Sequence, residues 1–415
     1  MLYPRSGQYP DPDSLAQPLP RSGIRHQGGE DHASPRYIFT RLCEITRCIF
    51  PEEDDALLQH QIEDGERIEP VHYMPIVPMV LVNGSSGIGT GYSTDIPMFS
   101  LVDVVAQVRR QIAGLDPEAI HVQYRGFTGA IEEENRTYTV KGTYKVVDET
   151  TIEITELPIR VWTQTYKAFL EDLMTGSPAG GSGKSAGKSA DKADPTISSF
   201  TEFHTDTKVH FVIKLPKEKL AQLVADGAIE KKFKLSAKVS TGNMRAFDAD
   251  GKMVKYACVE DIFKVHFEPR MAMYVARKDM LLARTKAEMA HLSNRARFIT
   301  AKIEGSLVIE KRKRAEIEAQ LRAEKYDPVD GSYSYLLGMT LDSLTDEKVR
   351  ALTAEVEKKR LDLATLQKTT PADMWTADLD NLMRAHAASE AAAAGGSGAG
   401  SGSGSAPAKP RGKKK

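Results

Sequence analysis

The sequence is poor in cysteine and tryptophan, carries almost no net charge and has no long apolar run. Its three cysteines, Cys43, Cys48 and Cys258, are odd in number and lack zinc-ligand spacing, which predicts reduced core thiols in an intracellular protein. No stretch approaches the ~18 apolar residues that cross a bilayer, and no secretory signal pattern is present, so we expect no membrane partner. The net charge of −1 excludes a polycation, so any affinity for nucleic acid must come from local basic clusters.

The composition and the order of local patterns predict an α+β protein with several domains. Hydrophobic residues make up 41% and charged residues 27% of the 415 residues, which is typical of a chain with a folded core. Residues 1–24, rich in Pro, Ser and Asp, are expected to form a loop. Helices are predicted within 34–60 and at 100–114, because apolar residues recur at helical spacing, and strands within 120–160, where apolar and polar residues alternate. Residues 200–265 read as mixed α/β.

Two stretches have compositions that cannot bury a core. Residues 176–195 are rich in Gly, Ser, Ala and Lys and are predicted to be a disordered insert, whose lysines either contact phosphates or remain solvated. Residues 386–415 are predicted to be a disordered tail. The tail ends in a basic cluster at 409–415, which reads as a nuclear import signal or as a weak nucleic-acid patch.

From residue 270 onward the pattern is helical. Apolar residues step by three and four from Met289 to Ile303 and again from Val349 to Leu366, where Lys359 interrupts the series. Residues 326–338 contain Pro328 and Gly331 and are expected to break the helix. This arrangement predicts a long antiparallel helical hairpin with a small head, although the seams alone indicate only that helices pack together.

The segment with the most chemical content is residues 28–40, which read GGEDHASPRYIFT. It resembles the nucleophile segment of eukaryotic-type DNA topoisomerase II, in which a tyrosine preceded by an arginine attacks a DNA phosphodiester. The resemblance assigns these catalytic roles to Tyr37 and Arg36. A free phenol, with a pKa of about 10, is a weak nucleophile at neutral pH. A neighbouring guanidinium favours the phenolate and stabilises charge that develops on the phosphate.

Residues near the tyrosine are candidates for DNA contacts. Arg25 corresponds to the arginine of a family turn. His26 and His32 either relay a proton or contact phosphate, or they are solvated loop histidines. Relative to the family turn, residues 10–22 resemble an insertion, which either displaces Arg25 or reflects a faulty gene model.

Residues 73–93, which read YMPIVPMVLVNGSSGIGTGYS, resemble the glycine-rich loop of the same family. The resemblance makes Ile88 an apolar wedge that enters a DNA base step and bends the duplex. Gly87 and Gly89 would allow the backbone to approach DNA closely, and a wedge that unstacks a step permits more wrapped contact. The segment lacks the third glycine of a dinucleotide fingerprint, and residues 183–185 lack the first glycine of a phosphate-binding loop.

Three further segments resemble the family in order, at 151–166, 202–213 and 292–299, so that the resemblance runs from about residue 23 to about residue 382. It implies a winged-helix remnant with the nucleophile at 1–60 and a mixed α/β tower that bends DNA at 61–265. It also implies a coiled coil with a dimerisation head at 266–385, before the tail at 386–415.

The implied function is that of a type IIA topoisomerase, an ATP-hydrolysing nuclear isomerase that cleaves, passes and religates double-stranded DNA as a homodimer. Mg²⁺ and ATP are expected for the full enzyme, but no motif for either is present, and Asp248 and Asp250 read as a turn. We therefore expect a separate chain, or a longer form of this one, to carry those modules. The alternative is an inactive dimeric clamp that bends DNA without cutting it.

Overall fold

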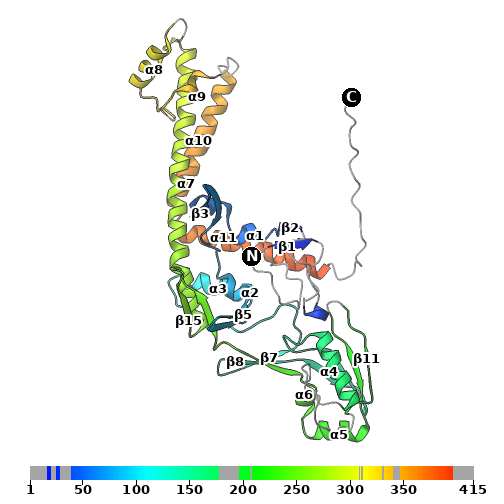
Figure 1. The fold of residues 1–415 in the computed structure, drawn as a ribbon. Helices are drawn as coiled ribbons and strands as arrows, with labels where there is room; N and C mark the ends of the chain where they lie inside the picture. The colour runs from blue at the N-terminus through cyan, green and yellow to red at the C-terminus, as the bar shows by residue number, and fades with distance from the viewer. Residues whose placement is uncertain are drawn as a thin grey trace. The chain divides into compact units, whose positions relative to one another are not determined.

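The computed structural model describes residues 16–19, 25–28, 39–176, 196–205, 208–307, 309, 312–329, 331–339 and 346–395 (Figure 1). The chain divides into two compact units, each built from separate stretches of sequence. The first unit comprises Met1–Pro51, Met74–Phe267 and Asp378–Lys415, and the second comprises Glu52–Tyr73 and Glu268–Ala377. No described helix is long and apolar enough to cross a membrane.

Antiparallel strand pairs build the sheets of the first unit. A four-stranded sheet has the order β11-β12-β10-β9, with β11 at Ser199–Glu202, β12 at Phe211–Lys214, β10 at Thr151–Glu156 and β9 at Thr143–Val146. A three-stranded sheet has the order β13-β8-β7, with Ser236–Ser240, Thr137–Lys141 and Ala130–Glu134. The remaining pairs are β1 with β2 (Ala16–Leu19, Phe39–Leu42), β5 with β6 (Ser85–Gly89, Tyr92–Ile96) and β14 with β15 (Met244–Phe247, Met253–Tyr256).

Short helices connect these strands. They are η1 (Arg25–Gln27), α1 (Thr46–Ile49), α2 (Met79–Asn83), α3 (Leu101–Ile112), α4 (Thr163–Thr175), α5 (Lys217–Ala225) and α6 (Ile229–Lys232). The helix predicted at 100–114 is confirmed as α3, which buries Val104, Val105 and Val108. The strands predicted within 120–160 are confirmed by β7 to β10.

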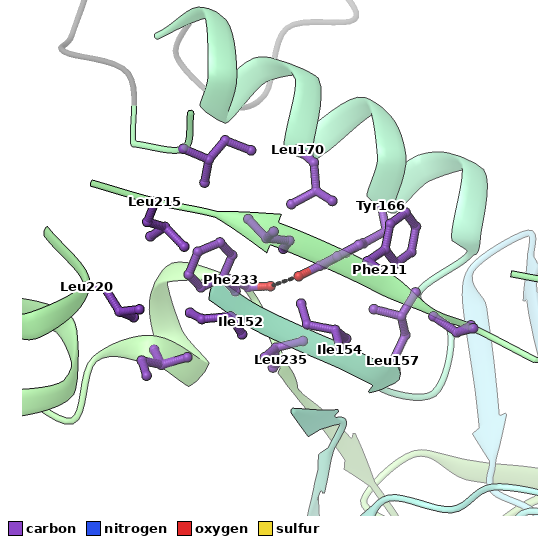
Figure 2. Close-up of a cluster of buried hydrophobic side chains, with 14 residues drawn as sticks. Ile152, Ile154, Leu157, Tyr166, Leu170, Phe211, Leu215, Leu220, Phe233 and Leu235 are labelled. Carbon is purple, nitrogen blue, oxygen red and sulfur yellow. Dashed lines mark hydrogen bonds between the residues drawn. The ribbon is translucent and has the colours of Figure 1, made fainter. Parts of the chain in front are cut away.

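Helix α4 packs on the four-stranded sheet and closes an apolar core (Figure 2). Ile152 and Ile154 of β10 share one face because side chains alternate along a strand, and Tyr166 and Leu170 share one face of α4 because they lie one turn apart. The Tyr166 hydroxyl donates a hydrogen bond of 2.8 Å to the carbonyl oxygen of Phe233. This bond satisfies the only polar atom of the Tyr166 side chain, and burial raises the pKa of Tyr166 well above its ordinary value.

The second unit is mainly helical. It contains η3 (Glu52–Leu57), β3 (His60–Glu63), β4 (Glu66–Pro70), α8 (Arg314–Ala323), α9 (Ser334–Leu337) and α10 (Asp346–Lys368). Helix α7 (Val259–Ile303) begins in the first unit and ends in the second. Helix α11 (Pro371–Gly395) begins in the second unit and ends in the first. An apolar cluster joins the end of α7 to α8 and α9, and its buried members are Phe298, Leu307, Ile317, Leu321, Tyr326, Tyr333 and Leu336.

Helices α7 and α10 run in opposite directions where they meet. The Lys359 ammonium lies 2.7 Å from a Glu288 carboxylate oxygen, and the Lys278 ammonium donates to the carbonyl oxygen of Gln367 at 3.2 Å. Lys278 comes before Glu288 on α7, whereas its partner Gln367 comes after Lys359 on α10, so the two helices are antiparallel. Lys359, which interrupts the apolar series in the sequence, therefore has an ion-pair partner on the facing helix.

Several expectations about local structure were wrong. Residues 1–24 are not all loop, because Ala16–Leu19 pairs with Phe39–Leu42, and this pairing places a strand inside the range 34–60, where a helix was predicted. Among the described residues of that range, Thr46–Ile49 is the α-helical part, and at 39–42 strand pairing outweighs local helical periodicity. The break predicted at 326–338 is correct for its first part, since 326–329 and 331–333 are not helical, but α9 lies within its second part. The long helix itself already ends at Ile303, and Gly305 follows it in the left-handed conformation that ends helices.

The prediction of a disordered tail at 386–415 is also wrong for residues 386–395. Helix α11 continues to Gly395 because alanine favours helix, and Leu382 and His386 are buried along it. The rest of that tail, from 396, lies outside the described residues, as do 177–195 of the predicted insert. The domain boundaries expected at 60, 265 and 385 remain predictions.

Candidate functional site

The β5–β6 hairpin carries Ile88 at an exposed position. Ile88 pairs with Ser93 across the hairpin, and the Ile88 residue is 94% exposed. A single exposed apolar side chain is common on protein surfaces. This one, however, occurs near the end of a two-stranded hairpin and between two glycines, so it projects without cover from neighbouring side chains of the described chain.

The two glycines that flank Ile88 differ in what they require. A Cβ at Gly89 would lie 2.7 Å from Cζ of Tyr92, so the Tyr92 ring occupies the space beside Gly89. A Cβ at Gly87 would meet nothing within 4 Å, and the φ of Gly87 is not positive. The chain itself therefore gives no steric reason for glycine at 87.

Strand β14 supports the hairpin from the side of β6. The backbone N–H of Asp95 donates to the carbonyl oxygen of Asn243 at 2.8 Å, and the amide of Asn243 donates to the Ser93 hydroxyl at 2.9 Å. The Thr94 hydroxyl donates to the carbonyl oxygen of Arg245 at 2.7 Å and accepts from the Arg245 N–H at 3.0 Å. These bonds hold the strand that faces Ile88 at three consecutive residues.

The segment that leads toward the predicted nucleophile is docked on α4 and β11. The rings of His26 and His204 are stacked with centroids 4.8 Å apart. Gly28 is buried with φ +65°, and a Cβ there would lie 2.8 Å from the Trp162 ring, so only glycine fits without displacing the indole. His26 and Gly28 thus fix the position of residues 25–28 on the sheet domain.

His204 has an environment that disfavours its charged form. Burial is the main cause that lowers the pKa of His204; the charge of Glu202 acts in the opposite direction, while His26 and Lys167 lower the pKa further. Lys167 itself is paired with Glu202, with the ammonium 2.6 Å from a carboxylate oxygen. A neutral His204 can stack on His26 without repulsion between two positive rings.

The structure describes only some of the predicted site residues. Arg36, Tyr37 and His32 lie outside the described residues, and for Arg25 the structure gives the backbone, which begins η1. Ile88, Gly87 and Gly89 lie on strand β5 of the β5–β6 hairpin. The described chain therefore shows the supports on either side of the nucleophile segment, at residue 28 and at the β2 strand from Phe39.

Several supporting residues were not predicted as part of the site. Asn243 and Arg245 follow β13 and are about 150 positions from the hairpin residues that they hold. Trp162 and His204 occur in segments that carried the family resemblance, but nothing in those segments tied them to residues 25–28. Their pairing is a property of the folded chain, because the pairing residues are far apart in the sequence.

The described residues do not offer a metal site. No group of three or more His, Cys, Asp or Glu residues among them is arranged to hold an ion. Asp248 and Asp250 form a turn, as predicted, since the Asp248 carboxylate accepts hydrogen bonds from the N–H groups of Asp250 and Lys252. Mg²⁺ prefers several oxygen ligands in octahedral geometry, and this turn does not supply them.

Comparison with solved structures identifies the class of the fold. The chain is similar to the DNA-binding, cleavage and re-ligation domain of Plasmodium falciparum topoisomerase II, with a TM-score of 0.80 and 32% identity over 92% of this chain and 53% of that chain. Its fold is thus that of part of a type IIA topoisomerase cleavage core, as the five sequence segments predicted. A family model for the A-type subunit of DNA gyrase/topoisomerase IV matches residues 15–380. The chain belongs to this family.

Curated relatives agree with that assignment. Human DNA topoisomerase 2-beta is 39% identical over 401 residues, which cover 88% of this chain and 24% of the relative. Arabidopsis thaliana DNA topoisomerase 2 is 38% identical over 412 residues, which cover 89% of this chain and 27% of the relative. The chain thus spans about a quarter of the length of the curated relatives that it matches.

Proposed function

We propose that this chain forms part of the DNA gate of a eukaryotic-type topoisomerase II, which cleaves and religates double-stranded DNA and passes a second duplex through the break. The observation that carries this proposal is the match of residues 15–380 to one family together with the topoisomerase II cleavage-domain fold. The full enzyme would hydrolyse ATP, require Mg²⁺ and act in the nucleus.

In the proposed reaction Tyr37 is the nucleophile. Its phenolic oxygen attacks a backbone phosphorus, a phosphotyrosyl bond forms, and the phosphorus–oxygen bond to one deoxyribose breaks and leaves a free hydroxyl. Arg36 would stabilise the phosphate as charge develops on it. Because one phosphodiester is exchanged for another, attack by the free hydroxyl reverses the step and releases the tyrosine. Arg25 and His32 are proposed contacts to the DNA backbone.

The β5–β6 hairpin is proposed to bend the DNA at the gate. Ile88 is exposed and has the apolar character of side chains that enter between base steps. Gly87 has room for a close approach, since no atom of the described chain lies within 4 Å of a Cβ built there. The anchoring of β6 by β14 supports this role, because a wedge must be held firmly to unstack a base step.

The helical part is proposed to be the exit gate. The antiparallel contacts between α7 and α10 fit a coiled-coil hairpin, and the apolar cluster around α8 and α9 fits a dimerisation head. Two copies of the chain would join there. Mg²⁺ would be bound outside the described residues. ATP and Mg²⁺ sites are proposed to lie on modules carried by a separate chain or by a longer form of this one.

The test is covalent trapping on DNA. The chain is incubated with nicked DNA and Mg²⁺, with and without added upstream modules, quenched with denaturant and compared with a Tyr37→Phe variant. A tyrosine-dependent adduct in the presence of the modules is expected. Absence of any adduct while DNA binding persists would contradict the cleavage function and leave the inactive clamp.

A further inference from the structure

The base of the β5–β6 hairpin is joined by an ion pair to the segment between β10 and α4. Nη1 of Arg160 lies 2.9 Å from Oδ2 of Asp95, and Nη2 lies 2.5 Å from Oδ1, so the two groups form a bidentate pair. Asp95 is on β6 opposite Ser86, and Arg160 lies between β10 and α4. A planar guanidinium held by both carboxylate oxygens fixes orientation as well as distance.

The backbone of Arg160 is strained in the conformation that makes this pair. Its φ is +70°, in the left-handed region that L side chains rarely adopt. A non-glycine residue keeps such a conformation only where its surroundings over-determine it. The bidentate pair with Asp95 is the contact that holds the Arg160 side chain in place.

The charges of the pair act on the buried phenol of Tyr124. Tyr124 is buried, and burial raises its pKa to about 12, while Arg160 lowers that pKa and Asp95 raises it. Both charges therefore act on one buried phenol. The Asp95 side chain is 29% exposed and the Arg160 side chain is 45% exposed, so the pair is screened less than a fully exposed one.

The pair completes the support of the strand that faces Ile88. Ser93 and Thr94 are held by Asn243 and Arg245, and the side chain of Asp95 is held by Arg160, from a different segment of the chain. The ion pair with Arg160, just before α4, thus adds a side-chain anchor at the base of the hairpin.

We propose that Arg160 and Asp95 are a positioning pair that sets the angle of the Ile88 hairpin and hence the bend imposed on DNA. The proposal rests on the proposed function of Ile88 as a wedge. It assigns to Arg160 a role inside the protein, in place of the phosphate contact that an exposed arginine near DNA would otherwise suggest.

The first measurement needs no DNA. Amide hydrogen exchange of residues 85–96 is compared in the full chain and in the Asp95→Asn and Arg160→Gln variants. We expect exchange to be about fivefold faster in both variants, as for loss of a well-formed ion pair. The charge-exchanged double variant Asp95→Arg/Arg160→Asp should recover most of the protection. Unchanged exchange in both single variants would overturn the proposal.

The second measurement is the DNA bend angle, from energy transfer between dyes at the ends of a duplex, with affinity measured at the same salt. Asp95→Asn and Arg160→Gln should reduce the bend with affinity changed by less than about threefold, and the double variant should restore it. Lys217→Gln is the matched control, because Lys217 forms an exposed ion pair of 2.5 Å with Glu149 elsewhere in the first unit.

The outcomes separate this proposal from the proposed function. If Ile88→Ala leaves the bend unchanged, the wedge role fails, whatever the pair does. If Ile88→Ala reduces the bend and the pair variants do not, only the positioning role fails. A loss of affinity and of salt dependence in Arg160→Gln, with no effect of Asp95→Asn, would make Arg160 a phosphate contact and would overturn the proposal.

Discussion

Arg277 and Asp54 form a buried bidentate ion pair in the second unit. Nε of Arg277 donates to Oδ1 of Asp54 at 2.6 Å and Nη2 donates to Oδ2 at 2.7 Å. Arg270 donates to the same Oδ2 at 2.7 Å. The Tyr274 ring lies 4.2 Å and 4.5 Å from the two guanidinium carbons and stacks on Trp375. Asp54 thus ties η3 to the long helix α7.

Asp54→Asn is expected to destabilise the second unit strongly. The change takes the Asp54 carboxylate away from two buried guanidinium groups, and breaking a buried pair on one side destabilises by about 3 to 5 kcal/mol. The check is denaturant unfolding, with hydrogen exchange to assign the loss to 268–303. Glu357→Gln, which removes an exposed carboxylate 3.8 Å from Arg360, should have no measurable effect. A loss below about 1 kcal/mol for Asp54→Asn would show that the cluster is not a stabilising clamp.

Gly28→Ala should disturb the docking of the nucleophile segment. The positive φ of Gly28 disfavours any side chain, and a Cβ there would lie 2.8 Å from the Trp162 ring. We therefore expect the unfolding free energy to fall by roughly 2 kcal/mol or more. Gly227→Ala is the control, because Gly227 has φ +60° but nothing within 4 Å of a Cβ. In fluorotryptophan NMR of the two tryptophans, Gly28→Ala should shift the Trp162 signal and leave that of Trp375 in place. Equal effects of the two substitutions would rule out a packing role for Trp162.

The stability of this docking should fall in mild acid. The folded pKa of His204 is lowered below its ordinary value of 6.5, mainly by burial, so the unfolded chain binds the proton first. The contribution of His204 is therefore complete above pH 6.5 and is lost as the pH falls through the folded pKa. Glu202 opposes this loss, whereas His26 and Lys167 favour it. Unfolding of the chain at about pH 7.5 and about pH 5.5 should differ less in His204→Phe, which keeps a ring for the stack and cannot titrate. An identical pH dependence in both proteins would contradict this account.

The elements that were predicted correctly are those whose pattern is local. Val104 and Val108 lie one turn apart on one face of α3, and Ile152 and Ile154 alternate along β10, so sequence neighbours alone decide both. The segment at Phe39–Leu42 was predicted wrongly because its partner strand, Ala16–Leu19, is more than 15 residues away and forms from a stretch that reads as loop. Pairing with a distant strand cannot be read from periodicity.

The same limit applies to the candidate site. Ile88 was singled out because one short segment, residues 73–93, resembles the glycine-rich loop of the family. The residues that support it were not, because Arg160 lies 65 positions from Asp95 and Arg245 lies 151 positions from Thr94. A lone arginine in a sequence carries no sign of whether it faces a phosphate or an aspartate. That distinction becomes visible only when the fold brings the distant residues together.

Gly87→Ala offers a last test of the DNA-facing hairpin. A Cβ at this position meets nothing within the described chain and the backbone is not left-handed, so the unfolding free energy should stay unchanged or rise by about 0.5 kcal/mol. If DNA approaches the hairpin closely, the same methyl group should still reduce the bend angle and weaken binding. Gly89→Ala is the comparison, since its Cβ would lie 2.7 Å from the Tyr92 ring and would disturb the hairpin even without DNA. A Gly87→Ala protein that is stable and bends DNA as the unaltered chain does would show that no duplex backbone passes close to residue 87.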